Sequence, residues 1–397
     1  MLETNMVMCT GCRACEIACP VKCISIRIDE EGFLYPKVDE ERCIQCGKCN
    51  KVCHAQFVDK TELTPGQMDE KFVLFGHNRA ALLVEKSSSG GAFSSIAECW
   101  SAEDGVVVGS AYAEDLYVRH ECCSVKNYEH LRKSKYVFSD PVNSYAQVQN
   151  YLRAGKKVLF TGTPCQVAGL KAFLGEEKEN EGLLTMDFIC HGTPSMQMLR
   201  DHLEYLEKKY QKKVIMVDFR SKKLGWKKHC LYCRFDDGSE YVAPWQDDYY
   251  LSLFMNYDNL SQCCYHCQYS NQHQVSDITV ADFWGLEKYK PELDTDEGES
   301  LLVANTAKGK HLLSLLNAQG IMDLQPLEEA YWRYIYKEHK YPEEKRRQFF
   351  DQYHKKGYEH MEKRFQTSRK VKNVLSDVKK RLKRILKCST EQFGKNS

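Results

Sequence analysis

Short apolar runs alternate with amphipathic stretches between residues 72 and 326. A continuous apolar run predicts a buried strand, and apolar residues at every third or fourth position predict a helix. Helices are predicted at 91–100, 167–173 and 308–317. Strands that alternate with helices in this way predict an α/β domain whose sheet is at least partly parallel. The predicted strands are Phe72–His77, Gly105–Ala111, Lys156–Phe160, Leu183–Ile189 and Leu301–Thr306.

Two other regions carry patterns that are typical of antiparallel strands. Residues 24–38 contain two short segments with alternating apolar and polar side chains around a glycine turn, which predicts a hairpin. Short alternating segments also fill residues 214–241, with a turn at residues 236–238. This second region is predicted to be an antiparallel insertion in the α/β domain.

Beyond about residue 327 the chain is predicted to be helical and is highly charged. Seven apolar residues between 371 and 386 fall on one helical face, and lysines and arginines crowd the remainder. A basic amphipathic helix can lie on an anionic membrane or dock on a partner, and a solvated helix packed on its own domain fits the pattern equally well. The predicted organisation is an N-terminal domain at 1–60, a linker at 61–71, an α/β domain at 72–326 and a charged helical tail at 327–397.

Composition excludes several classes of function. The chain has 397 residues with 56 Lys and Arg against 55 Asp and Glu, so no global field favours a nucleic-acid partner. No apolar run approaches the roughly 20 residues of a membrane-spanning helix. The first residues lack the features of an export signal, and 20 cysteines in such a chain are typical of a reducing compartment. We therefore expect a cytoplasmic protein that works without oxygen.

Eight of the cysteines form two runs of identical spacing near the start of the chain. Each run reads C-x2-C-x2-C-x3-C, which is the spacing of proteins that hold two [4Fe-4S] clusters. Three thiolates of each run bind one cluster, and the fourth thiolate reaches across to the other cluster. The first set is therefore predicted to be Cys9, Cys12, Cys15 and Cys53, and the second set Cys43, Cys46, Cys49 and Cys19.

Other interpretations of these runs fit less well. Disulfides are typical of secreted chains, and zinc sites prefer paired C-x2-C halves. The segment buries little surface by itself, so we expect its folding to depend on cluster insertion. His54 stands where the second run normally carries proline, which is not a ligand, so we expect a tuned environment and an intact cluster. Cys23 is off the ligand register and is predicted to be a packed thiol.

Further cysteines point to a third metal site. Half of such a site is present as a C-x2-C pair at Cys264 and Cys267, with Cys263 as an adjacent competitor. Two thiolates at predicted strand ends complete this third set, namely Cys165 and Cys190. Another C-x2-C pair falls within a predicted strand, where we expect a structural role for Cys230 and Cys233. No pattern assigns the remaining cysteines, Cys99, Cys122, Cys123 and Cys388.

Two loops have features of a cofactor site. Ser87–Gly91 precedes a predicted helix, where amides and hydroxyls suit a phosphate or a flavin pyrophosphate, although the same composition is typical of an ordinary N-cap. Thr161, Gly162 and Thr163 follow a predicted strand at the edge where α/β sheets bind ligands. The nearby Cys165 could be a nucleophile, a metal ligand or a core residue.

Together these motifs resemble the coenzyme F420 hydrogenase/dehydrogenase beta-subunit family with a fused N-terminal ferredoxin domain. The resemblance covers about residues 1–310 and keeps the order of the family's motifs. Besides the two cysteine runs, it is carried by Lys86–Phe93, Ser134–Tyr136, Leu159–Leu170, Ile189–Ser195, Lys223–Trp226, Cys264–Cys267 and Ser276–Gly285.

The resemblance implies a fold and cofactors. The implied fold is a ferredoxin-like α+β two-cluster domain, then an α/β flavin-binding domain that holds FAD beside a further [4Fe-4S] cluster, and a helical tail. The third set would bind that cluster. His191, beside Cys190, could tune the cluster, relay a proton or be structural. The residues that would line the flavin are Ser88, Ser89, Gly90, Gly91, Ser134, Lys135 and Tyr136.

The expected function is a flavin-dependent oxidoreductase that passes electrons between iron–sulfur clusters and a two-electron substrate or a deazaflavin-like coenzyme. A flavin can convert a two-electron hydride into single electrons, which clusters alone cannot do. The expected partner is a redox protein or a small-molecule acceptor. Two alternatives stay open, a non-catalytic electron-transfer subunit that serves a partner enzyme and an iron–sulfur protein of surface-polysaccharide synthesis.

Overall fold

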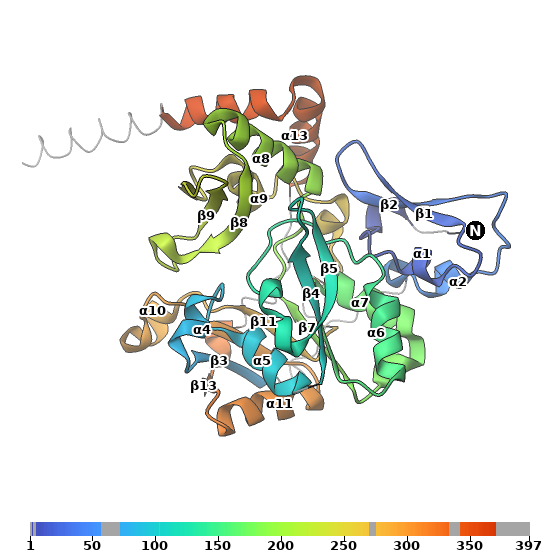
Figure 1. Ribbon diagram of the computed structural model, residues 1–397, viewed down its shortest axis with the longest axis vertical. Helices are drawn as coiled ribbons and strands as arrows, with labels where there is room; N and C mark the ends of the chain where they lie inside the picture. Colours follow the sequence, from blue (N-terminus) through green and yellow to red (C-terminus); the bar gives the residue numbers. More distant parts are fainter. Residues whose placement is uncertain are drawn as a thin grey trace, which may run out of the picture.

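The computed structural model describes residue 2 and residues 5–56, 72–102, 104–269, 275–332 and 342–370. The predicted linker at 61–71 and the basic amphipathic segment at 371–386 lie outside these ranges. Figure 1 shows a central sheet flanked by helices, a smaller lobe around β8 and β9, and the N-terminal part on the side of α6 and α7.

The central sheet is mixed, with eight strands in the order β13-β3-β12-β11-β7-β6-β4-β5. The middle strands β4, β6, β7 and β11 run parallel to one another, and the pairs at both edges are antiparallel. This confirms the prediction of a partly parallel sheet. The strands are β3 (Phe72–Asn78), β4 (Val106–Tyr112), β5 (Val118–Ser124), β6 (Val158–Thr161), β7 (Leu183–Phe188), β11 (Ile278–Asp282), β12 (Ser300–Ala304) and β13 (Met322–Pro326).

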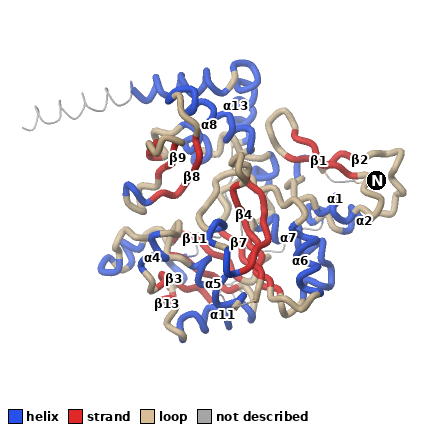
Figure 2. The backbone as a smooth tube through the Cα atoms, in the orientation of Figure 1, coloured by secondary structure: helices blue, strands red, loops and turns tan. Residues whose placement is uncertain are grey.

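Helices cover both faces of the central sheet, as Figure 2 shows. Successive residues of β4 and β6 point to opposite faces, so Val107 and Leu159 pack with α5 and α11, whereas Val108 and Phe160 pack with α6 and α7. Burial on both faces explains the continuous apolar runs in the sequence. The helices of this domain are α4 (Ala81–Glu85), α5 (Ala92–Ser101), α6 (Ser144–Arg153), α7 (Pro164–Leu174), α10 (Leu286–Tyr289), α11 (Ala307–Ala318) and α12 (Glu329–Trp332).

The predicted antiparallel insertion is a separate three-stranded sheet in the smaller lobe. Its core contains Phe219 and Tyr250 together with Phe350 and Met361 from the C-terminal segment, so this core crosses the boundary that the sequence suggests near residue 326. The elements are α8 (Met196–Tyr210), β8 (Val214–Ser221), β9 (Cys230–Phe235), β10 (Glu240–Pro244), α9 (Tyr249–Met255), α13 (Glu343–Lys356) and a helical run at 358–370.

The N-terminal part is small and is held largely by its cysteines. Its hairpin is confirmed as an antiparallel pair, and its core contains Cys19 and Cys23 with only a few apolar side chains. Helix α1 packs against α7, and Arg346 of α13 forms an ion pair with Glu31 at the hairpin turn. The elements are α1 (Ala14–Ala18), β1 (Ile24–Ile28), β2 (Leu34–Val38) and α2 (Lys48–Lys51).

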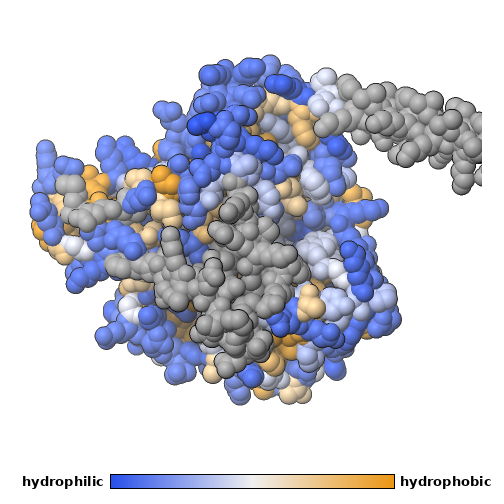
Figure 3. All heavy atoms as spheres, turned by 180° about the vertical axis from the view of Figure 1, so that it is seen from behind, coloured by the Kyte–Doolittle hydropathy of each residue, from blue (hydrophilic) through white to orange (hydrophobic). Residues whose placement is uncertain are grey.

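The hydropathy of the surface and of the helices bears on contact with a membrane. The face in Figure 3 is mainly hydrophilic, and its hydrophobic patches are small and scattered. Within the described ranges, no helix combines the length and the apolar character needed to cross a bilayer.

A buried ionic network joins the C-terminal segment to the smaller lobe. His202 on α8 is only 1% exposed and lies 3.1 Å from Asp248 and 3.7 Å from Glu362 of the helical run. The Tyr358 hydroxyl lies 2.9 Å from His202 Nδ1. Burial opposes the charge of His202, but the two carboxylates outweigh it and raise its pKa to about 9. The network therefore holds a charged imidazolium between two acids.

We expect His202→Gln to lower the free energy of unfolding by about 3 to 5 kcal/mol near pH 6, since it leaves two buried carboxylates without their cation. Because the folded-state pKa lies above the ordinary value of 6.5, wild-type stabilisation is complete below pH 6.5 and is lost as pH rises through about 9. The difference between variant and wild type should shrink over this range in urea unfolding. His130→Gln, at a partly exposed pair with Glu121, should change stability by less than about 0.5 kcal/mol.

Candidate metal centres and cofactor site

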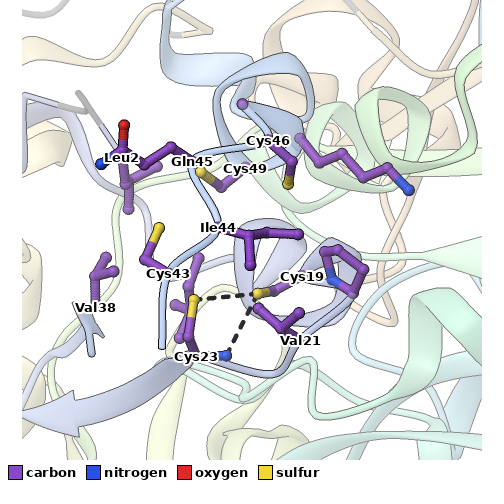
Figure 4. A pocket seen from close by; sticks show the side chains of 14 residues that line it. Leu2, Cys19, Val21, Cys23, Val38, Cys43, Ile44, Gln45, Cys46 and Cys49 are labelled. Carbon is purple, nitrogen blue, oxygen red and sulfur yellow. Dashed lines mark hydrogen bonds between the residues drawn. The ribbon is translucent and has the colours of Figure 1, made fainter. Parts of the chain in front are cut away.

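The second set of cysteines surrounds one pocket. The lining of the pocket includes Cys19, Cys43, Cys46 and Cys49. Figure 4 shows their sulfur atoms around this space, together with that of Cys23. Cys23, predicted to be a packed thiol, is buried in the small core here, with its Sγ 3.4 Å from Cys19 Sγ. The donor set therefore fits a thiolate-bound cluster in this pocket.

The first set gathers on the inner side of the N-terminal part. Burial raises the pKa of Cys9 to about 12, and the neighbouring thiols Cys12 and Cys53 raise it further. Cys15 shows the same upward direction, with Cys12, Cys9 and Cys53 as its electrostatic neighbours. The pKa values of Cys9, Cys12 and Cys15 are all raised, and thiols of this kind become stable thiolates beside a strong positive charge, which a metal cluster supplies.

A glycine lets the first set approach the central domain closely. A Cβ atom at Gly169 of α7 would lie 3.0 Å from Cys12 Cβ and 3.1 Å from its Sγ. Cys12 also packs at the edge of the core formed by α6, α7 and the sheet. The N-terminal part is therefore seated directly on α7.

The third set comes together from three separate loops. Because β6 and β7 are parallel neighbours, Cys165 at the start of α7 and Cys190 after β7 lie at the same sheet edge. Burial raises the pKa of both thiols, and the electrostatic neighbours of each include Cys264 and Cys267. Cys12 of the first set is also a neighbour of Cys165. The four predicted thiols are thus within mutual electrostatic reach and adjoin the first set.

The serine loop, Ser87–Gly91, leads from α4 to α5. Ser88 Oγ accepts hydrogen bonds from the Ser134 backbone N–H at 2.8 Å and from the Ser134 hydroxyl at 3.1 Å. A Cβ atom at Gly90 would lie 2.6 Å from a backbone oxygen of β3, so this position has no room for a side chain. The structure therefore brings together the two predicted flavin segments at 88–91 and 134–136.

The side chains of two residues predicted to line the flavin make contacts with other parts of the protein. Lys135 Nζ donates to the carbonyl oxygens of Leu131, Arg132 and Lys133, and burial lowers its pKa to about 7. Tyr136 stacks on Phe254 at 4.7 Å between ring centroids. These side chains shape the 131–136 loop.

One basic side chain contacts the serine loop, and two more are neighbours of that side chain. Lys222 Nζ donates to the carbonyl oxygens of Val84 and Ser89, and burial together with Lys133 and Arg220 lowers its pKa to about 8. Arg220 is 2% exposed. Lys133 is paired with Asp218 and Arg220 with Asp282, so Lys222 at the loop is the group best placed to favour an anionic phosphate.

An aromatic and basic group beside the serine loop was not predicted. Trp226 and Trp284 stack at 4.5 Å between ring centroids, and the Arg220 guanidinium lies 5.3 Å from the Trp284 ring centre. Arg220 is paired with Asp282 and contacts His229. Among the described residues, the buried Trp226 Nε1 and His229 Nε2 have no hydrogen-bond partner. Trp284 is 41% exposed. This exposure of a large aromatic side chain beside the loop could not be predicted from the sequence.

The remaining candidate residues lie near the third set. Thr163 Oγ1 is 3.0 Å from Cys165 Sγ and also caps α7, while Thr161 ends β6 and Gly162 lies between the strand and the cap. His191 stacks on Tyr257 at 4.1 Å between ring centroids and lowers the pKa of His229 along with burial and Arg220.

Other cysteines lie in packed positions. Cys230 and Cys233 are fully buried in β9, in agreement with the expected structural role. Within the described part of the chain, no three histidine, cysteine or acidic side chains are arranged to hold a single metal ion.

Comparisons with known proteins agree with this organisation. Residues 8–57, which include all eight cysteines of the first two sets, match the 4Fe-4S dicluster domain. Residues 155–330, which include the third set, match the family described as the C terminus of the beta subunit of coenzyme F420 hydrogenase/dehydrogenase. The serine loop precedes this second match.

Two individual proteins are similar to parts of the chain. A stretch of 51 residues, 12% of this chain, is 41% identical to ketoisovalerate oxidoreductase subunit VorC of Methanothermobacter marburgensis and covers 65% of that protein, less than two thirds of its length. A chain of the xenon-derivatised F420-reducing [NiFe] hydrogenase complex from Methanosarcina barkeri aligns with a TM-score of 0.47 at 15% identity, over 72% of this chain and 92% of that chain. The present chain is thus an iron–sulfur electron-transfer protein that carries a 4Fe-4S dicluster domain at residues 8–57 and, at residues 155–330, a region similar to the C terminus of the coenzyme F420 hydrogenase/dehydrogenase beta subunit.

Proposed function

We propose that the protein is an iron–sulfur flavoprotein oxidoreductase, in which three [4Fe-4S] clusters and an FAD connect a one-electron partner to a two-electron substrate. The observation that carries this proposal is a series of neighbouring groups that leads from the first set of cysteines through the third set to the serine loop. The cytoplasmic location, the domain limits and each ligand assignment are parts of the same proposal.

The first half of this line joins the two metal sites. Cys12 and Cys165 are electrostatic neighbours, and Gly169 allows Cys12 to lie against α7. The second set lies farther out, in a pocket whose lining includes the exposed Cys46. This order favours the second set as the entry point for single electrons.

The second half of the line leads from the third set to the serine loop. His191 follows Cys190 and lies near His229, which contacts Arg220 at 2.5 Å. Arg220 pairs with Asp282, and Lys222 holds the loop by its contact with the Ser89 carbonyl. A redox cofactor bound between these residues would adjoin the third set.

The chemical character of this region supports FAD as the occupant. The pyrophosphate would take the loop amides and the cations Lys222 and Lys133, and the ring system would lie beside the exposed face of Trp284. A bound flavin exchanges electron pairs with a substrate and single electrons with clusters. The protein residues bind the phosphates, orient the ring and exclude water.

One alternative has its own support. The relative VorC is a subunit of an oxidoreductase, and its similarity to this chain is confined to a stretch of 51 residues. An electron-transfer subunit without its own substrate would carry the clusters and lack tightly bound flavin. Turnover of a small-molecule acceptor by the isolated chain with an artificial electron donor separates the two proposals.

The test of the proposed function is the cofactor content of protein prepared without oxygen. We expect about one flavin per chain in the wild type and about tenfold weaker flavin retention in Lys222→Met, because a charge-assisted hydrogen bond is worth roughly 1.5 to 3 kcal/mol. Iron and sulfide should stay constant. The measurement is flavin released on denaturation, with a titration of FAD into depleted protein.

The matched control is Lys223→Met at the next position. Lys223 pairs with Glu240 on the smaller lobe and leaves the serine loop untouched, so its variant should retain flavin. Wild-type protein that contains full iron and binds no flavin would contradict the proposal and leave the electron-transfer subunit.

A further inference from the structure

We infer that a hydrogen-bonded bridge of Thr10, His54 and Tyr269 fixes the spacing between the first and third sets, which makes His54 and Tyr269 positioning residues for electron transfer between them. The inference rests on the proposed function, since it concerns two metal sites of the same relay. It also gives a role to the histidine that replaces the usual proline after the second cysteine run.

The imidazole of His54 joins the other two side chains directly. His54 Nε2 lies 3.0 Å from Thr10 Oγ1, and His54 Nδ1 lies 2.6 Å from the Tyr269 hydroxyl. The His54 and Tyr269 rings lie 5.8 Å apart between centroids, and His54 is 8% exposed. A neutral imidazole has one donor and one acceptor nitrogen, and a hydroxyl can complement either of them.

Each member of the bridge lies close in sequence to a predicted metal ligand. Thr10 follows Cys9, His54 follows Cys53, and Tyr269 comes two residues after Cys267. The bridge thus links backbone segments that hold the first set to the segment that holds the third set, across a sequence separation of 215 residues.

Tyr269 is also close to thiols of both sets. Thiols of both sets are its electrostatic neighbours, namely Cys12 and Cys53 of the first and Cys165 and Cys267 of the third. The Gly169 contact brings Cys12 against α7 but supplies no directional bond. The bridge supplies that direction, because hydrogen bonds fix both distance and angle.

The identity of residue 54 matters for this role. Proline at this position would have neither a side-chain donor nor an acceptor, so neither Thr10 nor Tyr269 could bond to it. The electron-transfer step moves one electron from the first set to the third, so the first is oxidised and the third is reduced. His54 and Tyr269 form and break no covalent bond and keep their protons.

The test uses the full chain, prepared without oxygen and reduced with dithionite, which supplies the electrons. We expect Tyr269→Phe and His54→Leu to keep their iron content. The magnetic interaction between reduced clusters, measured by electron paramagnetic resonance, should weaken, and electron transfer from the first to the third set should slow several-fold, because both depend on the distance between the two sets.

The matched control is Tyr353→Phe, which also removes a 2.6 Å tyrosine hydrogen bond, to Asp201, but on the smaller lobe. This variant should behave as wild type in both measurements. Should His54→Leu lose iron, Tyr269→Phe decides, because it leaves the residue beside Cys53 unchanged.

Unchanged magnetic interaction and an unchanged transfer rate in Tyr269→Phe would overturn the inference while the proposed function stands. Absence of iron from the third set in the wild type would instead contradict the proposed function itself. The two failures are therefore distinguishable in the same preparations.

Discussion

Cys264→Ala should lose about one third of the iron of the protein, with the iron of the first two sets retained. The C-x2-C pair of Cys264 and Cys267 supplies two of the four thiols that approach one another beside α7. With one ligand removed, a cluster in the third set would lose a protein anchor, whereas the first and second sets lie on other segments. Iron and sulfide analysis, together with the spectrum of the reduced protein, measures the loss.

The neighbouring Cys263→Ala is the matched control. Cys263 is 9% exposed, and its Sγ lies 3.3 Å from the Ser261 hydroxyl. The Cys263→Ala variant loses the same thiol group one position away, and we expect it to keep all of its iron. Iron loss in Cys263→Ala with full retention in Cys264→Ala would reassign the ligand, and full retention in both would contradict the third set as a metal site.

Removal of iron should unfold residues 5–56 and leave the central sheet folded. The N-terminal core consists mostly of cysteines, with Ile24, Val21 and Val38 as its aliphatic members. So small an apolar core cannot offset the loss of chain entropy, so cluster binding supplies the folding free energy. The central sheet has extensive apolar packing on both faces and does not need the clusters to stay folded.

Hydrogen exchange measured by mass spectrometry before and after anaerobic iron removal tests this expectation. Peptides from residues 5–56 should lose essentially all amide protection, and peptides from β6 and β7 should keep theirs. Reconstitution with iron and sulfide should restore protection in the N-terminal part. Retained protection of residues 5–56 in iron-free protein would show that the apolar contacts suffice.

The cysteine spacing was informative because ligand geometry is local. In each of the first two sets, three thiolates come from one short segment, so the spacing around Cys9 and Cys43 can be interpreted without knowledge of the fold. The third set needed one further step, since parallel strands end at the same edge and bring Cys165 near Cys190. The apolar runs predicted β3, β4, β6, β7 and β12, whose side chains are buried on both faces.

Contacts between segments far apart in the sequence could not be predicted from spacing or apolar patterns. The Trp226–Trp284 stack, the His54–Tyr269 bond and the network around His202 join residues far apart in the chain, and no periodic pattern encodes them. Several elements were also missed. Strand β5 and helices α6 and α8 mix polar and apolar residues, and their packing against neighbours decides their structure.

The close approach at Gly169 limits how freely the two halves of this chain could be recombined. A Cβ atom there would lie 3.0 Å from Cys12 Cβ and from the Tyr145 hydroxyl, so any other residue would require these neighbours to shift by a few tenths of an ångström. A two-cluster domain transplanted from another protein would pack against α7 at Gly169, and it would need a small residue at the position of Cys12. The two sides of this interface are therefore complementary in shape. Exchange of either half alone should increase the distance between the first and third sets and slow electron transfer between them.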